Sequence, residues 1–189
     1  MQFRGAVRDL IFDLIAAVPA AFEKPEFQVQ REALEDEFQN RKEDAFEKLG
    51  KEGRSRDVAI IQTPMGFSLA PLKNGEVLDP KSFNALTKAE QKRRQGQLKE
   101  VQDLLADTLR HLPKWERETR KSLSALERET AEAAITQSIE ETKASLRELP
   151  TAVKHLDAMH QDLVDNIVLF STFAAQSRES DTGPISPNG

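Results

Sequence analysis

Apolar side chains recur every three or four positions along most of the chain, which is typical of amphipathic helices. The first such stretch covers residues 6–18, and its apolar positions share one face: Val7, Leu10, Ile11, Leu14, Ile15 and Val18. Pro19 is expected to end or kink this helix, because proline has no backbone N–H to donate. We interpret the apolar face as a core-packing surface, with a membrane-surface helix as the alternative.

A second helix is predicted over residues 25–50. Pro25 suits the first turn of a helix. Apolar positions then follow at a spacing near 3.5 residues: Phe27, Leu34, Phe38, Ala45, Phe46 and Leu49. Charged side chains occupy most of the other positions, which is typical of a helix in a coiled-coil-like hairpin. Gly50 and Gly53 are expected to end this helix.

Residues 57–78 have strand-like character. Val58, Ile60 and Ile61 are β-branched residues that favour a strand. The tetrapeptide at residues 63–66, Thr-Pro-Met-Gly, has its proline second and its glycine last, as in a tight turn. The pattern therefore predicts one strand that ends in a turn at residue 63.

Two more strands are predicted after this turn. Residues 67–72 continue the strand pattern, and Pro71 is expected to restrict this strand to a sheet edge, because it cannot donate to a ladder. Asn74-Gly75 is a strong signal for a two-residue hairpin turn, and Val77-Leu78 follow it. We therefore predict a small three-stranded meander that packs against the helices, because so small a sheet is marginal alone.

The longest helical pattern covers residues 88 to about 147. A short helix over residues 80–86 precedes it, and Asp79 is expected to cap that helix. Thr87 and Glu90 form a capping-box pattern at the start of the long helix. Pro113 cannot donate a hydrogen bond, so a kink or break of the long helix is expected there, with Gly96 as a second weak point.

A last helix is predicted over residues 151–173. The remaining residues, 174–189, are polar and rich in Ser, Pro and Gly, and we expect them to be disordered. The predicted organisation is one helical domain, residues 1–173, with a β insertion at residues 57–78. The predicted fold class is mainly α, with long antiparallel coiled-coil-like helices and a small three-stranded β meander.

Composition and charge exclude several classes of protein. The 189 residues include 27 Lys and Arg against 32 Asp and Glu, and a net charge of -5 argues against a general nucleic-acid binder. The chain has no cysteine, which excludes a thiol nucleophile and a Cys-ligated metal site. No apolar run of about 18 residues occurs, so no membrane span is predicted. We expect the protein in the cytoplasm.

Candidate catalytic chemistry is sparse. The phosphate-binding patterns GxxxxGK[ST] and GxGxxG do not occur. His155 and His160 are expected on different sides of a helix, so they predict no two-histidine metal face. His111 has no obvious acidic partner in the sequence. We therefore predict no catalytic, cofactor-binding or metal-binding residue in this chain.

Three features suggest binding rather than catalysis. The basic run Lys92-Arg93-Arg94 is interpreted as a solvated helix face with ion pairs, in preference to a nucleic-acid contact. Trp115 is expected to pack on the apolar stripe, with an exposed binding role as the alternative. Met65 and Phe67 flank the tight turn, and they either pack on helix ends or offer an apolar edge to a partner or an unfolded chain.

Four segments follow one another in an order that carries a family resemblance: AAVPAAFEKPEFQVQREALEDEFQNRKEDAFEKL, IQTPMGFSLAPLKNGEVLDPKSFNAL, LRHLPKWERETRKSLSALERETAEAA and LPTAVKHLDAMHQDLVDNIVLF. Together they resemble the helical domain of bacterial Lon-like AAA+ ATP-dependent proteases (LonB or LonC type), in which the second segment contains the β element. The likeness covers residues 6–170. The nucleotide-binding motifs and the Ser-Lys dyad of that family do not occur in this chain.

The resemblance implies a non-catalytic helical domain that helps engage or gate unfolded polypeptide substrates for ATP-dependent proteolysis by its parent. The partners would be those substrates and the rest of a homo-hexameric protease, with ATP and Mg²⁺ possible in the parent and no cofactor in this chain. Met65, Phe67 and Trp115 are the predicted polypeptide contacts, and neither nucleic acid nor a membrane is an expected partner. A free-standing coiled-coil adaptor or scaffold is the alternative, and an RNA-binding helical arm is a third hypothesis.

Overall fold

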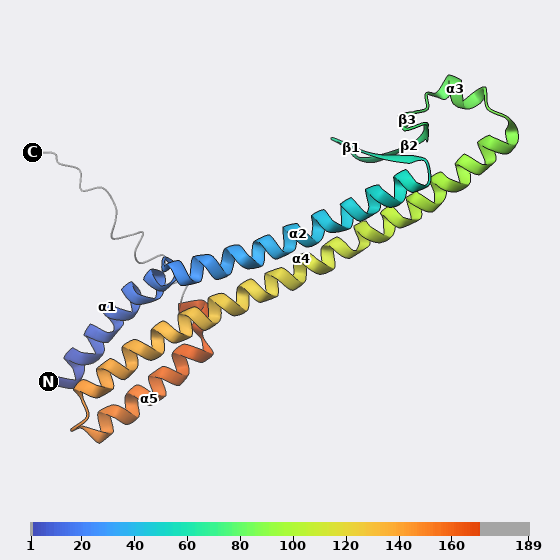
Figure 1. The fold of residues 1–189 in the computed structure, drawn as a ribbon. Helices are drawn as coiled ribbons and strands as arrows, with labels where there is room; N and C mark the ends of the chain where they lie inside the picture. The colour runs from blue at the N-terminus through green and yellow to red at the C-terminus, as the bar shows by residue number, and fades with distance from the viewer. Residues whose placement is uncertain (1, 171–189) are drawn as a thin grey trace, which may run out of the picture. The chain divides into compact units, whose positions relative to one another are not determined.

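The computed structural model describes residues 2–170 (Figure 1). The helices and strands follow in this order: α1 (Gln2–Phe22), α2 (Pro25–Ser55), β1 (Val58–Thr63), β2 (Gly66–Lys73), β3 (Glu76–Val77), α3 (Pro80–Asn84), α4 (Lys88–Ser145) and α5 (Pro150–Asp165). The predicted fold class, mainly α with one small β meander, is confirmed. The predicted tail, residues 174–189, lies outside the described residues.

Two compact units divide the chain. Of the described residues, the first unit contains 2–34 and 120–170, and the second unit contains 35–119. Helices α2 and α4 contribute residues to both units.

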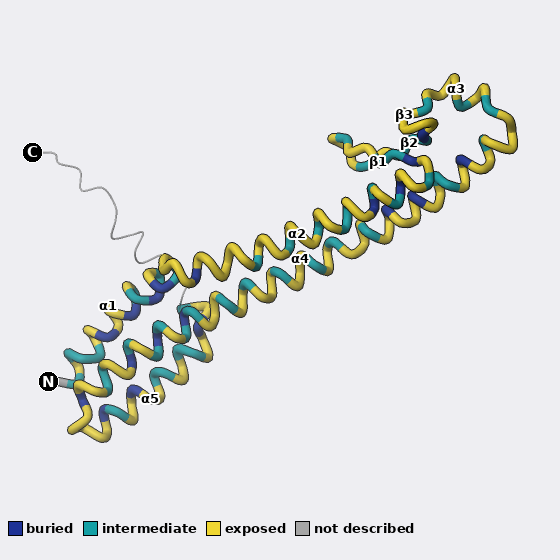
Figure 2. The backbone as a smooth tube through the Cα atoms, viewed as in Figure 1, coloured by how far each residue is buried: buried dark blue, intermediate teal, exposed yellow. Residues whose placement is uncertain are grey.

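The core of the first unit comes from α1, the last part of α4, and α5, with one residue just after α4 and one just after α5 (Figure 2). Its buried residues are Leu10, Leu14, Val18, Ala131, Ile135, Ile139, Leu146, Ala152, Leu156 and Ile167. The apolar face predicted in the first helix therefore packs in a core, although Ile11 of that face is exposed. Lys143 of α4 also donates to Asp157 of α5 at 2.6 Å, which links the two helices at the core's margin.

The predicted ends of the first two helices are wrong. α1 continues through Pro19 to Phe22, because Val18 and Ala21 are buried there and their packing offsets one missing hydrogen bond. α2 continues through Gly50 and Gly53 to Ser55. The chain leaves this helix at Asp57 instead, whose φ of 56° is left-handed.

The expected break at Pro113 is also absent, and α4 is helical from Lys88 to Ser145. The carbonyl group that Pro113 leaves without a donor belongs to Leu109, which is itself 37% exposed, so the missing hydrogen bond lies on an open part of the helix. Leu112 and Trp115, on either side of Pro113, are half-buried. α5 is shorter than the predicted helix over residues 151–173. It ends before Asn166, whose side chain donates to the Asp162 carbonyl at 2.9 Å, and a helical turn follows over residues 167–170.

The predicted meander is confirmed, with the antiparallel strand order β1-β2-β3. Left-handed φ angles at Gly66, Asn74 and Gly75 form the two tight turns. The edge position predicted from Pro71 is wrong, because β2 is the central strand. Pro71 is tolerated there because it lies where the ladder to β3 ends, and its carbonyl still accepts from Leu78 N at 2.8 Å.

None of the helices formed by residues 2–170 is long and apolar enough to cross a membrane.

Candidate polypeptide-contact site

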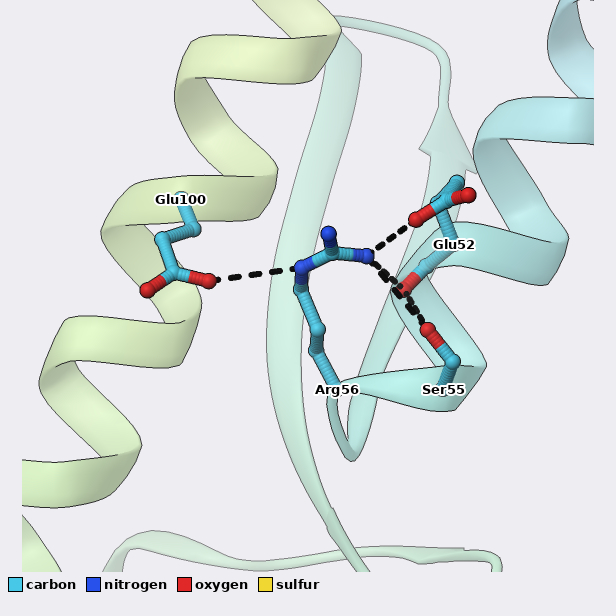
Figure 3. A network of polar contacts seen from close by, with 4 residues as sticks. All are labelled: Glu52, Ser55, Arg56 and Glu100. Carbon is cyan, nitrogen blue, oxygen red and sulfur yellow. Dashed lines mark hydrogen bonds and ion pairs between the residues drawn. The ribbon is translucent and has the colours of Figure 1, made fainter.

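Arg56 fixes the start of the β element to α2 and to α4 (Figure 3). Its guanidinium donates to the Glu52 carboxylate and, at 3.0 Å, to the Glu52 carbonyl, both on α2. Its Nε donates to Glu100 Oε2 of α4 at 3.3 Å. The hydrogen bond to Glu52 is the main cause that raises the pKa of Arg56, so this anchor stays charged.

A second ion pair shows the relative direction of α2 and α4 in this unit. Arg41 of α2 donates to Glu118 of α4 at 3.1 Å, whereas Arg56, the residue directly after α2, donates to Glu100 earlier in α4. The helices are therefore antiparallel within the second unit, as Figure 1 also shows.

Arg94 of α4 connects this helix to the sheet. It is only 6% exposed, and its Nη1 donates to the carbonyl of Leu72 in β2. Its Nε and the nearby Gln97 Oε1 are buried without a hydrogen-bond partner within residues 2–170. The interpretation of the basic run as a solvated face is therefore wrong for Arg94, although Lys92 and Arg93 are exposed.

The hairpin of β1 and β2 is anchored by one aromatic contact. The ring of Phe67 stacks on Phe46 of α2, with centroids 5.1 Å apart and an angle of 18° between the rings. Met65 at the turn is 99% exposed. Of the predicted pair, Phe67 therefore packs on a helix, while Met65 projects into solvent.

A groove with a volume of about 570 Å³ lies beside this anchor, and we call it the hairpin groove. It is lined by Lys42, Glu43, Phe46, Leu49, Gly50, Ile60, Gln62, Phe67 and Leu112. Its walls are mostly apolar and come from α2, the hairpin and α4. Volumes of this order, about 300–1,000 Å³, are typical of ligand sites.

Trp115 lies one helical turn beyond Leu112 on α4 and is half-buried. Arg41 covers its ring at 4.6 Å from the centroid, and His111 stacks on it at 6.0 Å. The expectation that His111 lacks an acidic partner is wrong, because its Nε2 is 3.6 Å from Asp107 Oδ2, one turn earlier on the helix. Trp115 is thus held by cationic and aromatic neighbours and does not itself line the hairpin groove.

The other two histidines lie in the first unit and do not meet. His160 Nε2 is 3.0 Å from Thr136 Oγ1, and the His155 ring is 5.9 Å from that of Phe3. In the part of the chain that the structure describes, no group of three or more His, Asp or Glu side chains is arranged to hold a metal ion.

Comparisons with protein families, with curated proteins and with solved structures found no match.

The sequence predicted three contact residues but missed most of the groove. Ile60 and Gln62 were detectable, because alternation along β1 places them on the face of Phe67, the partner of Gln62 in the register. Phe46 and Leu112 come from distant parts of the chain. Their convergence depends on how α2 and α4 pair, and no local pattern specifies that pairing.

Proposed function

We propose that this chain is a non-catalytic helical domain that contacts unfolded polypeptide through the β1–β2 hairpin. The observation that carries the proposal is the exposure of Met65 at the turn while Phe67, two residues away, is anchored on Phe46. A rigid hairpin that presents a flexible thioether side chain suits varied apolar partners, because methionine adapts its shape to each. The apolar hairpin groove beside it extends this surface.

The family resemblance supports the same proposal. In the Lon-like AAA+ proteases that the four segments resemble, the parent protein would supply ATP hydrolysis and peptide-bond cleavage. This chain would supply a contact for the unfolded substrate and would itself hydrolyse nothing. Its parent would be a homo-hexamer.

Binding to an unfolded chain tests the proposal directly. We expect the fluorescence anisotropy of a labelled, reduced and unfolded model protein to rise when the full chain is added. Met65→Ser should weaken this binding about three- to tenfold, because most of one apolar side chain is lost from the contact. Phe12→Ser is the matched control, since Phe12 is a 66% exposed apolar residue on α1, in the other unit.

The outcomes separate clearly. No change in anisotropy up to high micromolar concentrations of the wild-type chain would overturn the proposal. An equal loss in Met65→Ser and Phe12→Ser would mean that general surface hydrophobicity, and not the hairpin, binds the polypeptide.

A further inference from the structure

We infer that the free edge of β1 captures an extended polypeptide segment by main-chain pairing, so that the segment adds a strand to the sheet. This inference rests on the proposed function, because it names the way in which the unfolded polypeptide is held. The occupant is an uncharged, proline-free segment with apolar residues at alternate positions.

The first observation is which backbone groups face the edge. Among residues 2–170, β1 pairs with β2 alone, and the register is unbroken from Val58↔Pro71 to Thr63↔Gly66. Leu72 N donates to the carbonyl of Asp57 at 2.6 Å, so Asp57 faces β2. Because antiparallel pairing alternates along a strand, the N–H and C=O groups of Ile60 and Gln62 point away from β2.

These outward groups make no hydrogen bond within residues 2–170. The preceding residue of the same parity, Val58, is different, because its carbonyl lies against the last turn of α2 at Gly53. The open part of the edge is therefore centred on Ile60 and Gln62. It offers donors and acceptors in the pattern that an extended backbone complements.

The second observation is that nothing in the strand protects this edge. Native proteins guard edge strands with charged residues, prolines or bulges. β1 has the sequence Val-Ala-Ile-Ile-Gln-Thr, which contains no charge and no proline, and its unbroken register contains no bulge. An unguarded edge of this kind is a template for another strand.

The third observation is the position of the hairpin groove. Ile60 and Gln62, whose backbone groups face the edge, also place their side chains in the groove with Phe46, Phe67 and Leu112. In a pleated sheet, side chains of paired residues lie on the same face. Alternate side chains of an added strand would therefore enter the groove while its backbone pairs with β1.

Charge argues for a neutral occupant. Lys42 and Glu43 are the charged residues that line the groove, and their charges are opposite. The groove therefore offers no net charge to a strongly basic or acidic segment. The groove and the edge therefore recognise an extended backbone and apolar side chains, which every unfolded chain contains.

The test uses the full chain and a short labelled peptide of alternating valine and threonine. A second peptide of the same sequence carries N-methyl groups on alternate residues, which removes the donors of one edge and keeps the side chains. We expect the peptide to bind and N-methylation of the pairing edge to weaken binding about tenfold, since several main-chain hydrogen bonds are lost. N-methylation of the other edge is the control.

A protein variant tests the same main-chain pairing by changing β1 instead of the peptide. Gln62→Pro removes an outward N–H and leaves the ladder to β2 in place, whereas Gln62→Ala keeps the N–H and loses the same side chain. We expect about tenfold weaker peptide binding in Gln62→Pro and less than about twofold in Gln62→Ala. Slow amide exchange of Ala59 and Ile61 in both variants shows that the hairpin remains folded.

The results distinguish main-chain pairing at β1 from the more general proposal that the hairpin binds unfolded polypeptide. If both edge changes leave binding intact while Met65→Ser weakens it, main-chain pairing is overturned and the proposed function stands. If neither peptide nor unfolded protein binds the wild type, the proposed function fails, and this inference fails with it. A concentration-dependent dimer that Gln62→Pro abolishes, without peptide binding, would mean that the edge pairs with a second copy and would also overturn the inference.

Discussion

In the second unit, single side chains form hydrogen bonds at the ends of helices and strands. Asp79 caps α3, and its carboxylate accepts from Lys81 N at 2.9 Å, from Ser82 N at 3.1 Å and from the Ser82 hydroxyl at 2.6 Å. Arg94 closes β2 by its bond to the Leu72 carbonyl. The cap was predictable, because an Asp-Pro pair is a local signal. The role of Arg94 was not, since it depends on a partner far along the chain.

The Asp79 cap predicts a specific pH response. The Ser82 hydroxyl is the largest cause that lowers the pKa of Asp79 below its usual value, followed by the Ser82 N–H. The cap's contribution to stability is therefore complete above the unfolded pKa of about 3.9 and is lost as the pH falls through the lower folded pKa. In Ser82→Ala we expect the pKa of Asp79 to move back towards its usual value.

A carbon-detected NMR titration of the Asp79 carboxyl group measures this shift. Glu47, whose pKa is lowered mainly by a hydrogen bond from Lys51, should titrate unchanged in Ser82→Ala and serves as the internal control. An Asp79 that titrates at the usual value in the wild-type chain would contradict the assignment.

At the scale of elements, proline and glycine did not end a helix where buried neighbours or open space around them allowed the helix to continue. Pro19, Gly50, Gly53 and Pro113 all lie inside helices. The turns of the meander, by contrast, were predictable, because Gly66, Asn74 and Gly75 are needed for their φ angles. A breaker thus indicates a boundary reliably when the backbone conformation requires it, and weakly when it only lowers helix propensity.

Gly50 and Gly53 give a matched test of this distinction. A Cβ at Gly53 would lie 2.9 Å from the carbonyl oxygen of Val58, whereas a Cβ at Gly50 would have only the Arg54 side chain near it, at 3.9 Å. Gly50→Ala should therefore raise the free energy of unfolding by up to about 1 kcal/mol, through helix propensity. Gly53→Ala should lower it by about 1–3 kcal/mol, because β1 must move.

Urea unfolding followed by circular dichroism compares the two variants with the wild type. Equal stabilisation by both substitutions would contradict the proposed close approach of β1 to α2. A loss of polypeptide binding in Gly53→Ala alone would add that this approach positions the hairpin.

For the whole molecule, the sequence was sufficient for the fold class and insufficient for the site. Long periodic stripes predicted helices, and the strand pattern predicted the meander. The groove and the β1 edge follow from register and from helix pairing, which arise only when distant segments meet. The division into two units likewise follows from where buried residues are concentrated. The sequence does not show it, because the helical pattern of α2 and of α4 continues from one unit into the other.

The distribution of buried residues predicts two levels of stability. Ten buried residues form the core in the described part of the first unit, whereas the buried apolar side chains of the second unit are Leu49, Val58, Leu72, Val101 and Leu105. Less apolar burial means a smaller free energy of local opening. Amides of Ile135 and Leu156 should therefore exchange with deuterium more slowly than those of Val101 and Leu105, although all four lie within helices.

Native-state hydrogen exchange in low urea measures both groups in one sample, and Ile135→Ala provides the control. That substitution should speed exchange in the first unit, because it removes about 2–5 kcal/mol of core packing. Identical exchange free energies for both groups in the wild type would show instead that the chain opens as one cooperative body. A second unit that opens more readily would fit a hairpin whose β1 edge must be accessible to an added strand.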